Sequence, residues 1–412
     1  MPPSPRPQPD IRKYHLTSQE RKLPGISICI FIDAFGWELL ARHRFLDDML
    51  MVKQPLETIF GYSATCDPTI LTGLLPRDHG HFSFFVYDPE KSPFRHMPLL
   101  QLMRLVPKNL SNRNRVRSII GKMINKQLKY TGYFNIYNMP FSLMKYMDYS
   151  EKRDLYQQGG INSGSPTIMD YARERGIDFF LSDWKASEEQ NLKELTDAVL
   201  DPRRDCRFAY LYLASMDAVL HRVGTDRPEV SKKIAWYEQQ IRTLISTAQS
   251  RYREVRFFIF SDHGMTDVHE TCDVQGPVAA SGLEFGRDYA AVYDSTMARF
   301  WFFNSQASQR IREILKGLSC GEVLTEQQLA RWGVDFPDRR YGELFFLMHP
   351  GVLLLPSHMG DRPIAGMHGY SPEDKDSAAA FCSSCTLDQE ILRLDDLYGL
   401  MKGEIDRWLS VP

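Results

Sequence analysis

The stretch Ile26–Gly36, ISICIFIDAFG, decides the fold. Its first seven residues follow Pro24-Gly25 and are apolar apart from one serine, with several β-branched side chains. Such a run predicts a strand that is buried on both faces, as in a parallel sheet. Asp33 follows the run directly. Because open α/β sheets carry their functional groups just past the carboxyl ends of strands, Asp33 is the first candidate site residue.

Similar apolar runs recur along the chain and alternate with helical patterns. Strands are predicted at Phe179–Leu181, Phe208–Leu213 and Val255–Phe260, and further strands or a hairpin at Met297–Phe303 and Leu344–Leu355. Helices are predicted from Ser165 to Arg175, from Asp226 to Tyr252 and, at the C-terminus, from Leu387 to Trp408. This alternation predicts an α/β fold with a mostly parallel central sheet and helices on both faces.

The composition is that of an ordinary globular protein: 412 residues, 43% hydrophobic and 25% charged, with a net charge of −2. No run approaches the roughly 18 to 20 apolar residues of a membrane span. Met1–Asp10 holds five prolines and no apolar segment, so it does not resemble a signal peptide. We therefore expect a cytoplasmic protein with a flexible Pro-rich tail over residues 1–25.

The seven cysteines are odd in number and scattered, which favours reduced thiols over a disulfide framework. Cys382 and Cys385 form a C-x-x-C pair without a second pair or a nearby histidine. We interpret them as two small buried residues rather than as a zinc or redox site.

Carboxylates and imidazoles follow the predicted strands at four points. They are Asp33, Asp217 with His221 four residues later, the pair Asp262-His263, and His368 in a Gly-rich loop. If the chain is helical after Phe208–Leu213, Asp217 and His221 share one face. Each residue alone has a simpler explanation as a helix cap, a turn residue or a loop histidine. Together, three carboxylates and three imidazoles are the ligand mixture of a site for zinc or a similar divalent ion.

The segment Gly61–Gly80, GYSATCDPTILTGLLPRDHG, offers aliphatic hydroxyl groups on Ser63, Thr65, Thr69 and Thr72. In isolation such a hydroxyl at the start of a helix is a simple N-cap. Beside a metal ion the same hydroxyl becomes a nucleophile.

The ordered set of Asp33, Ser63…Thr72-Gly73-Leu-Leu-Pro76-x-x-His79-Gly80, Asp217-x-x-x-His221, Ser261-Asp262-His263-Gly264-Met265 and His368-Gly369-Tyr370 resembles the alkaline phosphatase superfamily. Over about residues 26–380 it is most similar to the nucleotide pyrophosphatase/phosphodiesterase branch. The resemblance implies hydrolysis of a phosphodiester or phosphoanhydride through a phosphoseryl intermediate, on two divalent metal ions with zinc favoured.

The resemblance also implies the roles of individual residues. In that branch the nucleophile stands nine residues before the Thr of the T-G pair, which implies Ser63, with Thr65 as the fallback. One metal would be held by Asp217, His221 and His368. The other would be held by Asp33, Asp262, His263 and the oxygen of the nucleophile.

Two departures leave the nucleotide preference open: Cys66 stands where the branch usually has Asn, and the nucleophile is Ser rather than Thr. A sulfatase is disfavoured because Cys66–Ile70, CDPTI, has Ile where the sulfatase motif requires Arg. A phosphomonoesterase on the same metal site remains an alternative. A non-catalytic binding protein on this scaffold is disfavoured, because such proteins usually lose ligands and all six are present.

The segment Lys91–Met147 holds eleven Lys and Arg and no Asp or Glu. We interpret residues 85–160 as a basic cap inserted into a catalytic domain of residues 26–385, with a C-terminal helix at 386–412 packed on it. The simplest interpretation is a solvated surface. The charge also suits an anionic phosphoester substrate, lipid-linked or nucleotide-containing, or peripheral contact with acidic lipids. Nucleic acid is disfavoured, because aromatic residues concentrate only from Tyr130 onward.

Overall fold

The computed structural model describes residues 22–103, 105–107 and 113–409, and its centre is a six-stranded sheet in the order β2-β16-β7-β1-β6-β5. The strands are β1 (Leu23–Ile32), β2 (Val52–Leu56), β5 (Phe179–Leu181), β6 (Phe208–Leu213), β7 (Tyr252–Phe260) and β16 (Ala379–Ser383). β1 pairs in parallel with β6 and β7, and β5 pairs in parallel with β6. β16 runs antiparallel to both of its neighbours. The predicted α/β fold with a mostly parallel sheet is confirmed.

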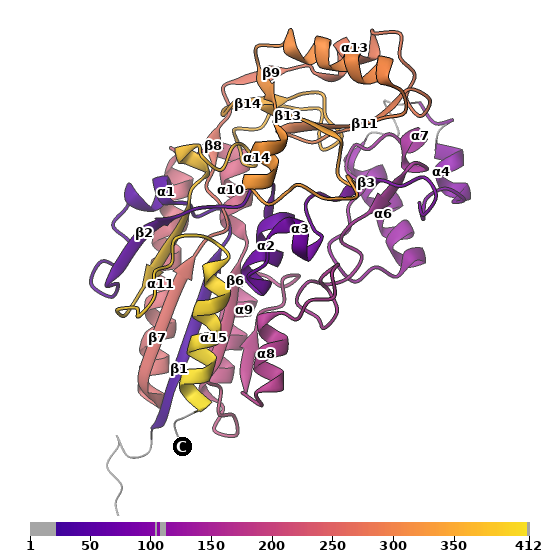
Figure 1. Ribbon diagram of the computed structural model, residues 1–412. Helices are drawn as coiled ribbons and strands as arrows, with labels where there is room; N and C mark the ends of the chain where they lie inside the picture. Colours follow the sequence, from indigo (N-terminus) through magenta and orange to yellow (C-terminus); the bar gives the residue numbers. More distant parts are fainter. Residues whose placement is uncertain (1–21, 104, 108–112, 410–412) are drawn as a thin grey trace, which may run out of the picture.

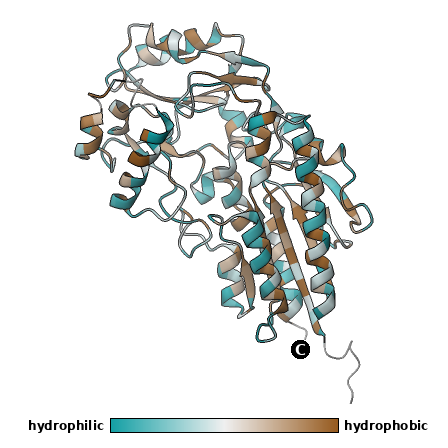
Figure 2. Ribbon diagram, turned by 180° about the vertical axis from the view of Figure 1, so that it is seen from behind, coloured by the Kyte–Doolittle hydropathy of each residue, from teal (hydrophilic) through white to brown (hydrophobic). Residues whose placement is uncertain are grey.

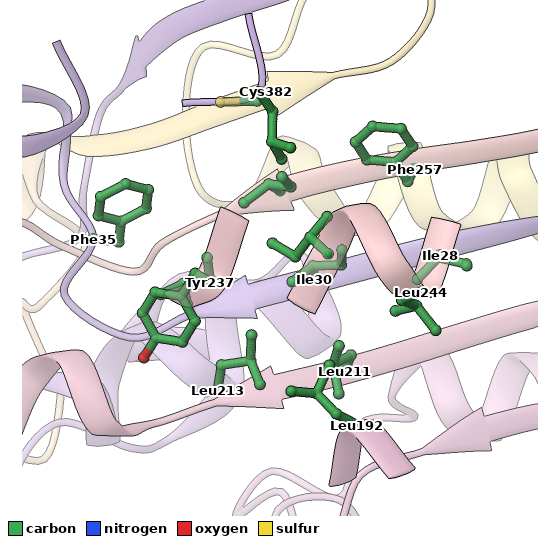
Figure 3. Close-up of a cluster of buried hydrophobic side chains, with 14 of the residues drawn as sticks. Ile28, Ile30, Phe35, Leu192, Leu211, Leu213, Tyr237, Leu244, Phe257 and Cys382 are labelled. Carbon is green, nitrogen blue, oxygen red and sulfur yellow. The ribbon is translucent and has the colours of Figure 1, made fainter. Parts of the chain in front are cut away.

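Successive residues of β1 face opposite sides of the sheet, as the pleat requires. Ile28 and Ile30 pack against one layer of helices, and Cys29 and Phe31 against the other. The first layer comprises α1 (Trp37–Ala41), α9 (Glu188–Leu200), α10 (Ser215–Val223) and α11 (Pro228–Arg251). The second comprises α2 (Ser63–Thr72), α8 (Ile168–Glu174) and α15 (Asp396–Leu409). Figure 3 shows buried side chains between the sheet and the first layer, among them Ile30, Leu192 and Tyr237. Figure 2 shows hydrophobic strands flanked by helices of mixed hydropathy.

Two predicted helix starts are wrong, each for a local reason. α8 begins after Thr167 rather than at Ser165, because Thr167 and Asp170 bond to each other's backbone N–H in a capping box. α15 begins at Asp396 rather than at Leu387. The Asp396 carboxylate accepts the backbone N–H groups of Leu392 and Arg393, which fixes the chain in a turn just before the helix.

A second, antiparallel sheet has the order β10-β11-β13-β12 and lies at the far end of the molecule from the C-terminus (Figure 1). Its strands are β10 (Tyr289–Tyr293), β11 (Met297–Phe302), β12 (Gly321–Val323) and β13 (Leu344–Met348). The neighbouring helices are α12 (Gln275–Ala279), α13 (Ser305–Lys316) and α14 (Glu326–Arg331). The predicted segment Leu344–Leu355 is two strands rather than a hairpin, because β14 (Val352–Leu354) pairs with β9 (Glu270–Cys272).

One pair of cysteines is oxidised. Cys272, at the end of β9, forms a disulfide with Cys320, which precedes β12, so the prediction of seven reduced thiols is wrong for this pair. The other five cysteines are free. Cys382 is buried in the central sheet, whereas Cys385 is only partly buried, so the prediction of two buried residues holds for Cys382 alone.

The predicted insertion contains β3 (Phe85–Tyr87), α4 (Pro98–Met103), α6 (Asn114–Leu128), α7 (Phe141–Met144) and β4 (Met147–Tyr149). β3 and β4 pair with each other, so the chain leaves and re-enters at one place. A core that includes Leu100, Ile120 and Ile124 packs against β10 and β11 of the second sheet. None of the described helices combines the length and the apolar character that crossing a bilayer requires. β1 includes the last residues of the predicted tail, and residues 1–21 lie outside the described residues.

Candidate two-metal active site

The predicted ligands meet at the carboxyl ends of three central strands. Asp33 follows β1, and Asp262-His263 follow β7, whose parallel register pairs Phe31 with Phe260. The backbone N–H of Ala34 donates to Asp262 Oδ1 at 3.1 Å and joins the two loops. Asp217 and His221 lie on α10, directly after β6. His368 follows β15 (Gly366–Met367), which pairs with β8 (Thr266–Asp267).

Asp33, Asp262 and His263 form the first group of candidate metal ligands, with ligand atoms within 4.8 Å of one another. His263 Nε2 lies 2.9 Å from Asp262 Oδ2 and 3.9 Å from Asp33 Oδ1. All three side chains are buried, and Asp33 Oδ1 and Asp262 Oδ2 have no hydrogen-bond partner among the described residues. Buried carboxylate oxygens without a partner are costly, and a cation between them removes that cost.

Asp217, His263 and His368 form the second group. Asp217 Oδ1 lies 3.5 Å from His368 Nε2 and 3.2 Å from Nε2 of His221, which stands next to this group. The rings of His263 and His368 stack at 3.7 Å between centroids. The structure thus brings all six predicted ligands together, and His263 contributes to both groups.

Backbone carbonyls orient two of the imidazoles. His221 Nδ1 lies 2.8 Å from the Gly366 carbonyl, and His263 Nδ1 lies 2.9 Å from the Gly264 carbonyl. These contacts keep the proton on Nδ1 and leave Nε2 free to bind a metal. Gly264 is required at its position, because a Cβ there would lie 2.1 Å from the Asp376 carbonyl oxygen in the helical turn η1 (Lys375–Ser377).

In the absence of cations, the carboxylates and imidazoles of the site shift one another's pKa values. Burial and the neighbouring carboxylates of Asp262, Asp217 and Asp67 raise the pKa of Asp33 well above its usual range. Burial lowers the pKa of His263, but Asp262, Asp217 and the Gly264 carbonyl together raise that pKa overall. Burial and the charge of His263 lower the pKa of His368. A cluster of three carboxylates and three imidazoles with these properties fits two divalent cations.

Ser63 is the first residue of α2 and lies at the metal ligands. Its Oγ is 3.1 Å from His263 Nε2. Thr65, the fallback nucleophile, is buried, and its hydroxyl donates to the Phe82 carbonyl at 2.6 Å. Thr69 bonds to His79, at the end of α3 (Pro76–His79), and Thr72 donates to the Pro68 carbonyl. Of the four Ser and Thr hydroxyls in this segment, that of Ser63 alone belongs to a residue that lines the cavity.

The cavity over these residues has a volume of about 560 Å³. Its lining contains side chains that the sequence analysis missed: Asp67, Phe84, Tyr133, Glu151, Asp154, Trp184 and Tyr212. Tyr212 donates its hydroxyl to Asp33 Oδ2 at 2.6 Å. The position of Asp67 at the cavity could have been predicted from the sequence, because Asp67 follows Ser63 by one helical turn and so lies on the same face of the helix.

The described Lys and Arg residues of the insertion do not line this cavity. Arg115, Lys122 and Lys126 are exposed on α6. Arg117 is buried and donates to the carbonyl groups of Tyr137 and Met139, so it holds the insertion together. The basic charge that was expected to suit an anionic substrate is therefore not seen at the cavity in the described part of the insertion.

An α/β sheet with two groups of carboxylate and imidazole ligands beside a serine is the arrangement of the alkaline phosphatase superfamily. The profile of the type I phosphodiesterase/nucleotide pyrophosphatase family matches residues 27–371, and the chain belongs to this family of enzymes. The predicted resemblance is thereby confirmed.

Solved structures of one relative share the fold. The murine ectonucleotide pyrophosphatase/phosphodiesterase 5 superposes with a TM-score of 0.64 at 15% identity, over 92% of this chain and 95% of that one. An inactive form of the murine protein in complex with AMP gives the same TM-score and identity, with coverages of 94% and 95%. The human protein gives the same values as the first murine structure. Comparison of the sequence with curated proteins gives no match.

Proposed function

We propose that this protein hydrolyses a phosphodiester or phosphoanhydride, with Ser63 as the nucleophile. The observation that carries the proposal is the position of Ser63 Oγ, 3.1 Å from His263 Nε2, where the two groups of candidate ligands meet. Ser63 and Ala64 also place the N-terminus of the ten-residue helix α2 at the cavity, where its backbone N–H groups favour an anion.

The ligand sets are those that the family resemblance implies. Asp217, His221 and His368 would hold one cation, and Asp33, Asp262 and His263 the other, together with Ser63 Oγ. Mixed imidazole and carboxylate donors favour zinc. When bound, two such ions neutralise the charge of the phosphoryl oxygens and lower the pKa of an adjacent hydroxyl.

The reaction has two steps at Ser63. Its oxygen attacks the phosphorus in line, the bond to the leaving oxygen breaks, and the phosphoryl group with its remaining substituent stays on Ser63. Water then displaces Ser63 Oγ from phosphorus and restores the enzyme. The buried ligands keep the reacting oxygens in fixed positions, which is the main source of catalysis in phosphoryl transfer.

Comparing the hydrolysis of bis(p-nitrophenyl) phosphate with that of p-nitrophenyl phosphate distinguishes a diesterase from a monoesterase. We expect a higher kcat/KM for the diester, and the p-nitrophenyl ester of thymidine 5′-monophosphate tests a nucleotide substrate. The murine relative with bound AMP supports including a nucleotide. A strong preference for the monoester would make the protein a phosphomonoesterase. A protein that neither binds Zn²⁺ nor hydrolyses any of the three would be a binding protein.

We also propose peripheral contact of α6 with acidic lipids. Ile119 and Met123 are 59% and 54% exposed, and they stand among exposed Arg115, Lys122 and Lys126. This mixture suits an interfacial helix. The protein should sediment with phosphatidylglycerol vesicles at low salt, and Ile119→Ser with Met123→Ser should release it. Leu392→Ser, at a residue that is 57% exposed, is the matched control. Protein that stays in the supernatant would show that α6 is a solvated surface.

The cytoplasmic location stays a prediction. The Cys272–Cys320 disulfide argues against this location, because disulfides persist mainly in oxidising compartments. Alkylation of free thiols in lysed cells, followed by mass spectrometry of the two cysteines, tests it. A fully oxidised pair in the native host would contradict a reducing location.

A further inference from the structure

The cavity has a second wall beyond the candidate metal ligands. This acidic wall consists of the carboxylates of Asp67, Glu151 and Asp154 and the rings of Tyr133 and Tyr137, which all line the same cavity as Ser63. None of the three carboxylates belongs to either group of candidate metal ligands. Among the described residues, no Lys or Arg lines the cavity.

The acceptors of the acidic wall lack cationic partners. Glu151 is 8% exposed and accepts the backbone N–H of Tyr133 at 3.2 Å. Asp154 accepts the backbone N–H of Tyr156 at 3.0 Å, and Asp67 Oδ1 is buried without a hydrogen-bond partner. None of these carboxylates forms an ion pair within the described chain.

A buried hydroxyl gives an independent sign of a missing partner. Tyr156 lines the cavity and is 7% exposed, and its hydroxyl has no hydrogen-bond partner in the described structure other than the neighbouring Tyr210 hydroxyl. Buried polar groups are nearly always paired, so unpaired groups around one cavity point to a ligand that supplies hydrogen-bond donors.

The aromatic rings in and beside the acidic wall indicate that the hydrogen-bond donor of the ligand is a cation. The hydroxyl oxygens of Tyr133 and Tyr137 lie 2.9 Å apart, and the Phe84 ring lies 5.3 Å and 5.8 Å from these two rings. The Trp184 ring lies 6.3 Å from that of Tyr133. Aromatic faces attract cations, as carboxylates do. Burial raises the pKa of Glu151 to about 8, and a bound cation would favour its ionised form.

We propose that the acidic wall binds a protonated primary amine of the substrate, so that the preferred substrate is a phosphoester carrying an ammonium group close to phosphorus. This inference rests on the proposed hydrolysis at Ser63. A primary amine fits better than a quaternary ammonium, because its three N–H donors can satisfy the unpaired acceptors. The described basic residues of the insertion do not line the cavity and play no part in this recognition.

The test compares two substrates of equal size. In 2-aminoethyl p-nitrophenyl phosphate the ammonium group replaces the terminal methyl group of propyl p-nitrophenyl phosphate. We expect kcat/KM to favour the amine by roughly tenfold or more, the effect of a hydrogen bond to a charged group. Glu151→Gln and, independently, Asp67→Asn should bring the ratio close to one. Glu322→Gln, at an exposed residue of β12, should leave the ratio unchanged.

The other possible outcomes distinguish failure of this inference from failure of the proposed function. A propyl ester hydrolysed as fast as the amine overturns the inference but not the proposed function. If neither ester is hydrolysed, the proposed function fails, and calorimetry with O-phosphoethanolamine against propyl phosphate then tests the acidic wall by itself. Equal affinity for the two would overturn the inference. Loss of one equivalent of bound metal in Glu151→Gln would also overturn it, because the wall would then hold a third ion.

Discussion

Glu151 allows a quantitative test of the electrostatics of the cavity through protein stability. Burial raises the pKa of this carboxyl from 4.5 to about 8, with a further contribution from Asp154, and the N–H of Tyr133 partly opposes the rise. A folded-state pKa above the unfolded value means that ionisation costs folding free energy. The cost is absent below pH 4.5, grows as the pH rises and is complete above pH 8.

The size of the cost follows from about 1.36 kcal/mol for each pKa unit. Integrated over the two protonation equilibria, it is about 1 kcal/mol at pH 5 and about 4 to 5 kcal/mol at pH 9. Glu151→Gln removes the ionisable group and keeps its shape. We therefore expect the variant to gain about 4 kcal/mol in unfolding free energy, relative to the parent protein, between pH 5 and pH 9.

Urea unfolding of both proteins at pH 5, 7 and 9, followed by tryptophan fluorescence, measures this difference. Glu322→Gln controls for the loss of a surface charge. A stability difference between Glu151→Gln and the parent that is the same at pH 5 and pH 9 would refute the reasoning, because Glu151 would then have an ordinary environment.

Three further predictions concern the second sheet and the metals. Replacing Cys272 and Cys320 by Ser opens a loop with a sequence separation of 48 and should lower the unfolding free energy by about 4 kcal/mol; no change in the denaturation midpoint would contradict this. Arg299→Ala leaves Asp294 buried without its partner at 2.8 Å and should cost about 3 to 5 kcal/mol, whereas a cost below about 1 kcal/mol would show that Asp294 is otherwise satisfied. Removing metals with a chelator should abolish activity and lower the thermal midpoint, and Zn²⁺ should restore both; full activity of the metal-free protein would rule out the two-metal site.

The strands of the central sheet were predictable because their signal is local. Phe179–Leu181 and Phe208–Leu213 coincide with β5 and β6, since short runs of large apolar residues leave little choice of length. Helix starts were less predictable. Ser165 and Thr167 are both good N-caps, and the choice depends on Asp170, which pairs with Thr167.

The candidate ligands were predictable because parallel strands bring their carboxyl ends to one edge. The acidic wall was not, since Glu151 reaches the cavity only through the pairing of β3 with β4. The disulfide depends in the same way on tertiary structure, because Cys272 ends β9 and Cys320 precedes β12, 48 residues later in the sequence. The charge of the insertion was visible in the sequence, but the direction in which each Lys and Arg points was not.

The most direct test of the central claim is a search for the covalent intermediate on Ser63. Acid quenching during turnover of bis(p-nitrophenyl) phosphate, followed by digestion and mass spectrometry, should show the nitrophenyl phosphoryl group on the peptide that contains Ser63. Ser63→Ala should lose this adduct and at least about 10³-fold of kcat while keeping its metal content. Full activity of Ser63→Ala, together with loss of activity in Thr65→Val, would contradict the account.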